Sequence, residues 1–164
     1  MSQGKIWKYG DNVNTDVIFP GKHTYSPMEP EEMAAHALED LDPEFAGKVQ
    51  RGDFVVAGRN FGCGSSREQA AVCLKYAGVQ AVIAGSFARI FFRNAINQGL
   101  PVIQCPDLAE HVETGDVIDL DLEKGVIKSG EKEFFFPQLP DSVRGILKEG
   151  GLIPFTRKRL QKKK

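Results

Sequence analysis

The sequence is poor in cysteine, with three in 164 residues: Cys63, Cys73 and Cys105. An odd number cannot pair completely, and no Cys-x-x-Cys or Cys/His spacing typical of a zinc site is present. The chain also lacks an apolar run of 18 residues, which excludes a membrane-spanning helix. Its first residues lack the apolar region of a secretory signal. We therefore expect a protein of the reducing cytoplasm.

Net charge is also nearly absent, because 21 basic residues face 22 acidic ones. Apolar residues make up 41% of the chain and charged residues 26%, which excludes wholesale disorder. The length is that of one ordinary domain. With no internal repeat and no low-complexity linker, we expect a single domain over residues 1–164.

The charges are unevenly distributed along the chain. Six basic residues and no acid lie in 157–164, which leaves the remainder acidic. A basic end can bind nucleic acid, but a frayed, solvated terminus is the commoner case, and an acidic body argues against a nucleic-acid role. Residues 29–44 hold seven acids, with Met33, Ala37 and Leu41 at helical spacing, which predicts an amphipathic helix.

The centre of the chain alternates short apolar runs with helical patterns. Such alternation predicts parallel strands joined by right-handed helical crossovers. The expected strands are 6–9, 54–58, 81–85 and 101–104, and the expected helices are 66–77 and 88–98.

The sequence pattern changes after residue 107, where short runs of alternating apolar and polar residues are separated by turn residues. This spacing predicts antiparallel strands. We expect strands at 117–122, 125–128 and 133–136, a helix at 142–149 and a last edge strand at 152–155. The fold class is α/β, with a parallel central sheet and a β-rich periphery.

A glycine-rich turn carries the clearest chemistry. Residues 60–70 read N-F-G-C-G-S-S-R-E-Q-A, between an expected strand and an expected helix. Ser65 followed by Glu68 is the spacing of a capping box. The first amides of a helix attract a carboxylate or phosphate, and the planar fork of Arg67 matches a carboxylate. The turn therefore indicates an anion site, although a simple helix cap with a surface arginine would give the same spacing.

Known nucleophile and phosphate motifs do not fit this turn. The P-loop pattern is absent, and Ser65 does not lie in a G-x-S-x-G elbow. No histidine stands near it in the sequence to activate it. If Ser65 does chemistry, a cation and helix amides must stabilise its alkoxide.

Two further polar clusters flank the turn in the sequence. Residues 86–94 carry Arg89 and Arg93 on one expected helix face, after a strand end. Such arginines are usually solvated, but the carboxyl ends of parallel strands are where open α/β sheets bind ligands. Residues 11–20 contain Asp16, which we expect to hold a neighbouring arginine or a backbone turn.

Together and in this order, the three clusters resemble the small subunits of 3-isopropylmalate dehydratase, swivel domains of the aconitase superfamily. The matching motifs are G-D-N-V-N-T-D-V-I-F-P, N-F-G-C-G-S-S-R-E-Q-A and I-A-G-S-F-A-R-I-F-F-R-N-A-I-N-Q-G-L-P. The resemblance covers essentially the whole chain.

The resemblance implies a three-layer β/β/α swivel domain that docks on a separate large subunit, as a heterodimer or heterotetramer. That partner would hold a [4Fe–4S] cluster through its own cysteines, so this chain is expected to bind no cofactor or metal. Carried onto this sequence, Ser65 is the general base, Ser66, Arg67 and Gly64 bind substrate, and Asp16 matches the active-site aspartate. Ser65, Arg67 and Asp16 are the catalytic set.

The implied reaction isomerises 2-isopropylmalate and 3-isopropylmalate by dehydration and rehydration, in leucine biosynthesis. Residues 22–27 read K-H-T-Y-S-P, where leucine-pathway members often carry Tyr-Leu. Homoaconitate, dimethylmalate, methyl-substituted malates and citrate-like acids therefore stay open as substrates. A non-catalytic anion-binding module and an RNA-binding protein are the alternatives from other functional classes.

Overall fold

The fold is built on one mixed sheet of seven strands, and the computed structural model describes all of residues 1–164. The order across the sheet is β4-β3-β2-β1-β5-β6-β7. The strands are β1 (Ser2–Lys8), β2 (Phe54–Ala57), β3 (Ala81–Ala84), β4 (Val102–Gln104), β5 (Val117–Asp121), β6 (Val126–Ser129) and β7 (Lys132–Phe135). Most of the expected strands are confirmed to within one or two residues.

Strand β1 joins two halves of the sheet that differ in direction. Residues 2–5 pair antiparallel with β5, whereas residues 6–8 pair parallel with β2. Strands β1 to β4 form the parallel half, and β5 to β7 continue as an antiparallel meander. The expectation of a parallel central sheet is therefore only partly right, because the sheet is mixed.

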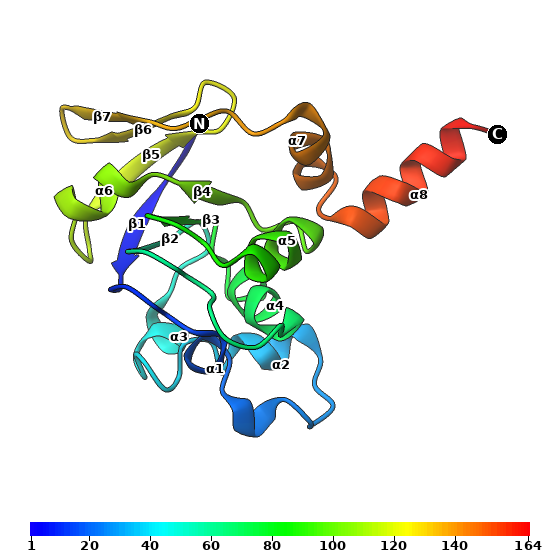
Figure 1. The fold of residues 1–164 in the computed structure, drawn as a ribbon, viewed down its shortest axis with the longest axis horizontal. Helices are drawn as coiled ribbons and strands as arrows, with labels where there is room; N and C mark the ends of the chain where they lie inside the picture. Colours follow the sequence, from blue (N-terminus) through cyan, green and yellow to red (C-terminus); the bar gives the residue numbers. More distant parts are fainter.

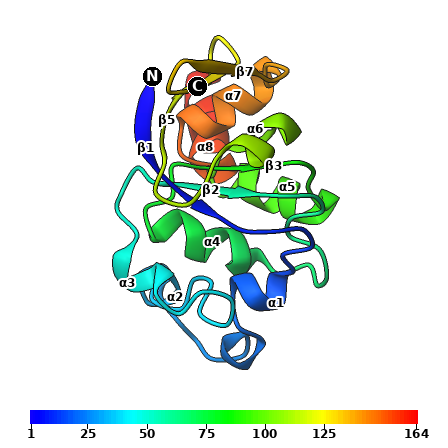
Figure 2. The ribbon, with the colours of Figure 1, turned by 90° about the vertical axis from the view of Figure 1, so that its left-hand side faces the viewer.

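Two cores lie on opposite faces of the parallel half. Alternate residues of β2 enter them: Phe54 and Val56 on one face, Val55 and Ala57 on the other, as the period of two in a strand requires. Buried residues of β5 and β6 share the core of Phe54 and Val56. The sheet thus curls so that its antiparallel half covers one face of its parallel half (Figure 2).

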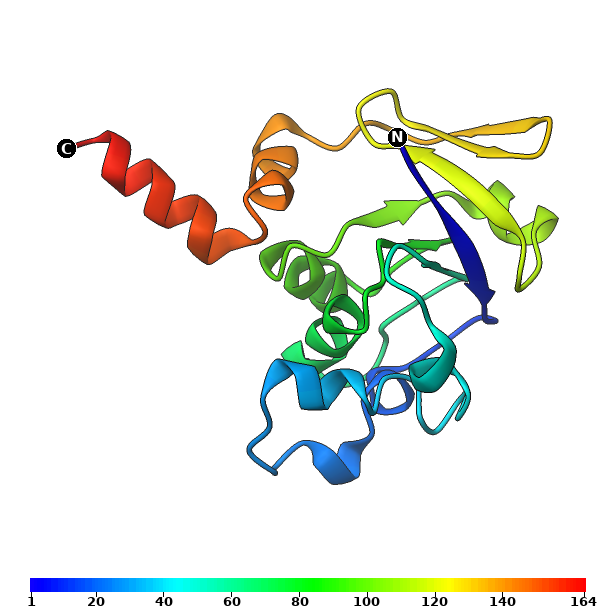
Figure 3. The same cartoon turned by 180° about the vertical axis from the view of Figure 1, so that it is seen from behind.

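Helices α4 and α5 cover the other face of the parallel half (Figure 1). Helix α2, at the bottom of the molecule in Figure 3, packs against α4. The helical segments are α1 (Thr15–Ile18), the 3₁₀ turn η1 (Gly21–His23), α2 (Pro30–Ala34), α3 (Phe45–Lys48), α4 (Glu68–Tyr76), α5 (Arg89–Asn97), α6 (Pro106–His111), α7 (Asp141–Lys148) and α8 (Leu152–Lys162). None of these helices is long and apolar enough to cross a membrane.

The single amphipathic helix expected over 29–44 is wrong. Helix α2 ends at Ala34, and the chain continues through turns to α3. Leu38 is fully buried in a left-handed conformation (φ +56°), and its amide donates to the Ile18 carbonyl at 2.8 Å. A tertiary hydrogen bond and burial therefore override the helical spacing of the apolar residues.

The edge strand expected at 152–155 is also wrong, because these residues begin helix α8. Pro154 falls in the first turn, where its missing N–H costs no helical hydrogen bond. The residues that follow are mostly strong helix formers. The basic stretch expected to fray is helical as far as Lys162, on a helix that projects from the body (Figure 1).

Asp53 is the one carboxylate that is buried, and it ties β1 to the start of β2. It accepts hydrogen bonds from Trp7 Nε1 at 3.0 Å, from the Gln50 amide at 2.9 Å and from the Lys5 amide at 3.3 Å. Replacing it leaves three donors without their partner, and each such loss costs free energy of unfolding.

We predict that Asp53→Ala lowers the free energy of unfolding by about 3 kcal/mol, because buried donors lose their acceptor. Urea unfolding followed by circular dichroism measures the change. Glu131→Ala, at an exposed carboxylate without an ion pair, is the matched control and should change stability by less than about 0.5 kcal/mol. Equal stability of the two variants would contradict the structural role of Asp53.

Candidate active site

Three loops lie side by side where the parallel strands β1, β2 and β3 end. The parallel pairing continues past the strands, through isolated bridges that join Asn14 to Cys63 and Phe61 to Phe87. The Thr15 amide donates to the Cys63 carbonyl at 2.8 Å. The three polar clusters of the sequence therefore meet at one edge of the sheet, the edge where α/β sheets bind ligands.

The glycine-rich turn of the middle loop needs its glycines. Gly62 has φ +82°, and a Cβ there would lie 2.2 Å from Phe91 Cγ. Gly64 has φ +96°, which side chains rarely adopt. The turn thereby raises Gly64, Ser65 and Ser66 to the surface, where all three are exposed.

The expected capping box is wrong. Helix α4 begins at Glu68 with Arg67 as its N-cap residue, and no side chain caps it. The Glu68 carboxylate instead accepts a hydrogen bond from Gln98. Ser65 and Ser66 lie two residues and one residue before the N-cap position, and the amides of Glu68 and Gln69 have no backbone acceptor. These free amides carry the positive end of the helix dipole.

Arg67 and Asp16 form an ion pair between the first and middle loops. Asp16 is placed by α1, whose N-cap Asn14 accepts from the Val17 amide at 3.1 Å. The Arg67 side chain is 21% exposed and that of Asp16 is 59% exposed. Arg67 Nη1 is buried and faces Asp16 Oδ1, so the other N–H groups of the guanidinium are the donors available to a carboxylate.

Two residues beside this pair were not found from the sequence. Gly21 borders the guanidinium so closely that a Cβ there would lie 3.2 Å from Arg67 Nη1. Thr15 Oγ1 is buried beneath the turn without a partner. In the sequence, Thr15 is distinguished only as a β-branched residue between two polar ones, which is weak evidence for a place in the site.

The third loop supplies cations without partners. Arg89 and Arg93 are exposed at the start and in the middle of α5, and neither forms an ion pair. Arg59, which follows β2, is exposed and unpaired as well. Three unpaired guanidinium groups at this end of the sheet favour anionic ligands.

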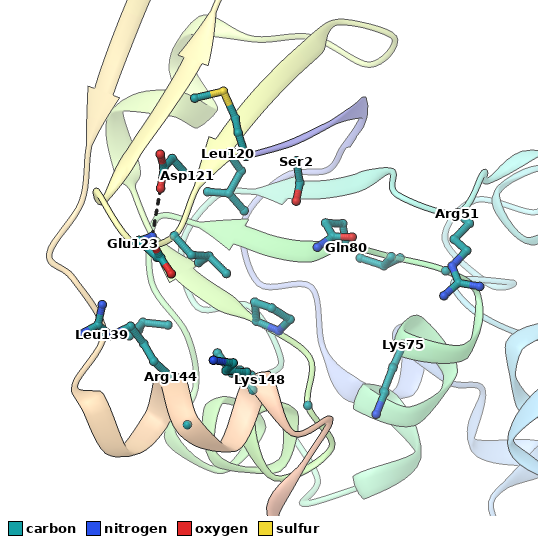
Figure 4. A pocket seen from close by; sticks show the side chains of 18 of the residues that line it. Ser2, Arg51, Lys75, Gln80, Leu120, Asp121, Glu123, Leu139, Arg144 and Lys148 are labelled. Atoms are coloured by element: carbon teal, nitrogen blue, oxygen red, sulfur yellow. Dashed lines mark hydrogen bonds between the residues drawn. The ribbon is translucent and has the colours of Figure 1, made fainter. Parts of the chain in front are cut away.

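A hollow of about 1280 Å³ lies at the opposite end of the sheet (Figure 4). Its lining includes Ser2, Arg51 and Gln80, which stand at the amino ends of strands, and helix α7 forms one wall. A smaller hollow of about 520 Å³ lies at the carboxyl ends and includes Asp11 and Arg59. Strand direction favours the smaller hollow as the ligand site, because open α/β sheets bind ligands at the carboxyl ends of their strands.

The cysteines of this chain do not fit an iron–sulfur cluster. Cys73 and Cys105 are buried in different cores, and Cys63 lies half-buried in the turn. The Cys73 thiol contacts the carbonyls of Ile18 and Ala70 at 3.5 and 3.2 Å. A cluster needs several thiolates at one point, and these three are spread over separate parts of the fold.

We predict that Cys63 is the only rapidly reacting thiol of the native chain. Burial raises the pKa of Cys73 and that of Cys105, so both remain protonated and covered. A chromogenic disulfide reagent should titrate one thiol quickly, and Cys63→Ser should abolish this phase. Cys105→Ser is the control and should retain it; three thiols of equal rate would contradict the structure.

Comparisons with known proteins reveal similarity in both sequence and fold. Residues 11–108 match the model of the aconitase C-terminal domain. Small subunits of 3-isopropylmalate dehydratase from Caldicellulosiruptor saccharolyticus and Archaeoglobus fulgidus are 51% and 53% identical, over 98% and 94% of this chain and 93% and 96% of theirs.

A solved structure shares the fold over nearly the whole chain. The crystal structure of 3-isopropylmalate dehydratase from Methanocaldococcus jannaschii has a TM-score of 0.91 and 44% identity, covering 98% of this chain and 97% of that one. The sequence identity, the shared fold and the near-complete mutual coverage lead to one conclusion. The chain belongs to the family of 3-isopropylmalate dehydratase small subunits, within the aconitase superfamily.

Proposed function

We propose that this chain supplies the base and the carboxylate-binding groups of a 3-isopropylmalate dehydratase. This hydro-lyase interconverts 2-isopropylmalate and 3-isopropylmalate in leucine biosynthesis. The observation that carries the proposal is the exposed turn of Gly64, Ser65 and Ser66. It stands beside the free amides of α4 and the Asp16–Arg67 pair.

Ser65 acts as the general base. A free serine hydroxyl loses its proton only far above neutral pH, so the alkoxide needs nearby positive charge. Arg67 and the N-terminal amides of α4 provide it, in a site where the serine hydroxyl caps nothing. The alkoxide takes the proton from the carbon beside a substrate carboxylate. The C–H electrons then form the C=C bond as the neighbouring hydroxyl leaves as hydroxide, which becomes water by taking up a proton from solvent.

Water then adds back across the C=C bond with the hydroxyl and the proton on exchanged carbons, which completes the isomerisation. Ser66, Gly64 and Arg67 hold the substrate carboxylate, and charge that builds on it during proton removal is stabilised by the same donors. Asp16 keeps the guanidinium at the turn through the ion pair. Arg59, Arg89 and Arg93 raise the local concentration of an anionic substrate.

The exposed turn needs a partner to complete the site. Ser65 and Ser66 face solvent in this chain, whereas the positive charge that stabilises an alkoxide acts more strongly where bulk water is excluded. We assign the opposite wall to the large subunit, in a heterodimer or heterotetramer in which residues 1–164 act as one swivel domain. A [4Fe–4S] cluster on that subunit would supply the Lewis acid for the leaving hydroxyl. The setting is the cytoplasm.

The isopropyl substrate is favoured over the other malates by the relatives. Proteins about half identical to this chain over nearly its whole length carry the name 3-isopropylmalate dehydratase small subunit. The unusual loop 22–27 leaves this choice to experiment. The test is a panel of malate derivatives offered to the complex with the large subunit. The largest kcat/KM should fall on isopropylmalate, and a larger value for homoaconitate would overturn the choice.

We predict that Ser65→Ala lowers kcat at least about 1000-fold in the complex with the large subunit, because the base is lost. KM should change little, since Ser66 and Arg67 still hold the carboxylate. Ser142→Ala, at an exposed serine on α7, should behave as the parent. Co-purification with the large subunit checks assembly of each variant, and near-normal turnover of Ser65→Ala would rule out the base.

We predict that Arg67→Lys lowers kcat/KM about 100-fold, because lysine cannot form the two parallel hydrogen bonds of a guanidinium to a carboxylate. Steady-state kinetics of the same complex measures the loss. Arg51→Lys, at an exposed arginine near the amino ends of the strands, should retain the parental value. If both lysine variants were equally active, Arg67 would not bind the substrate carboxylate.

A further inference from the structure

Two histidines and a glutamate converge beside the candidate active site. His23 Nε2 lies 3.3 Å from Glu39 Oε2, and His36 Nδ1 lies 2.8 Å from the same oxygen. All three ligand atoms lie within 4.8 Å of one another. Nothing in the proposed reaction uses this cluster, which joins η1 to the turns that follow α2.

The backbone holds the three side chains in place. His36 and Glu39 are joined by a turn in which the Glu39 amide donates to the His36 carbonyl at 3.2 Å. Leu38, between them, is anchored in the core through its hydrogen bond to Ile18. The His23 ring stacks on that of His36, with centroids 3.9 Å apart. The three side chains are therefore gathered before any ligand arrives, and the two stacked rings would tilt apart for their nitrogens to aim at one ion.

The distances suit a tetrahedral metal ion. Zn²⁺ binds histidine nitrogen and carboxylate oxygen at about 2.1 Å, which places neighbouring ligand atoms about 3.4 Å apart. The observed 3.3 Å needs almost no movement, and the 2.8 Å contact needs to open by about half an ångström. Water would fill the fourth position, because the three side chains are 20% to 35% exposed.

The charges are compatible with a cation. The Glu39 carboxylate is the anionic member of the ligand set, and each histidine would bind as a neutral imidazole that gives up its proton from the binding nitrogen. Lys22 contacts the other oxygen, Oε1, at 3.6 Å and is 61% exposed. Lys22 does not contact Oε2, the oxygen that faces the histidines, and its side chain can move into solvent when a cation binds.

We infer that His23, His36 and Glu39 bind one divalent transition-metal ion of the Zn²⁺ class. Two imidazole nitrogens and one carboxylate oxygen form the ligand set, which selects such ions over Ca²⁺ or Mg²⁺. The ion would fasten η1 to the segment after α2. Because η1 begins at Gly21, which borders the Arg67 guanidinium, the ion would also fix the backbone beside the candidate active site.

The test uses the full chain without a histidine tag, stripped with a chelator, in a Cys63→Ser background that removes the half-exposed thiol. Zn²⁺ is titrated by calorimetry, and thermal unfolding is recorded with and without the ion. We expect one Zn²⁺ per chain and a rise in Tm, because an ion that binds only the folded state stabilises it. Co²⁺ in place of Zn²⁺ should give the visible absorption of a tetrahedral site.

His36→Ala and Glu39→Gln should each weaken Zn²⁺ binding at least about tenfold and abolish the rise in Tm, because one of three ligands is lost. Their Tm in chelator shows whether they fold. His111→Ala is the matched control, since His111 is exposed on α6 and outside the cluster, and it should bind as the parent does. Absence of stoichiometric binding in the parent, or unchanged binding by His36→Ala, would overturn the inference.

Discussion

The ion pair between Asp16 and Arg67 is the contact on which the candidate site depends. It joins two loops that are 51 positions apart in the sequence and fixes a guanidinium beside a turn that carries two exposed hydroxyls. Both side chains lie near the surface, so the pair itself contributes little to stability. The pair matters for position: it holds the Arg67 guanidinium in place through Nη1, while the first amides of α4 keep no backbone acceptor.

The sheet explains why these groups meet. Parallel strands end at the same edge, and the pairing of β1, β2 and β3 continues into their loops. The antiparallel half curls away to cover the other core, so it leaves this edge open. An open edge with exposed serines and three unpaired arginines is what the proposed two-subunit site requires of this chain. The chain therefore has the form expected of a subunit that works against a partner.

Much of this architecture could be predicted from the sequence. Apolar runs and glycine stops located the strands and helices α4, α5 and α7, because local patterns decide these elements. The patterns failed where distant contacts decide. Leu38 leaves the helical conformation to reach Ile18, and residues 152–155 begin helix α8 instead of adding a strand to the sheet.

For the candidate site, the sequence motif pointed to Ser65, but the spacing of Ser65 to Glu68 wrongly predicted a capping box. Only the folded turn shows that helix α4 begins after the serines. The histidine cluster joins residues 13 positions apart and left no local signal.

The central claim is that Ser65, held between Arg67 and the amides of α4, removes a proton from carbon. A crystal structure of the complex with the large subunit and bound isopropylmalate tests it most directly. The account predicts Ser65 Oγ about 3–3.5 Å from the carbon that loses its proton, with the adjoining carboxylate on Arg67. A substrate carbon facing another basic side chain, with Ser65 turned away from it, would contradict the account.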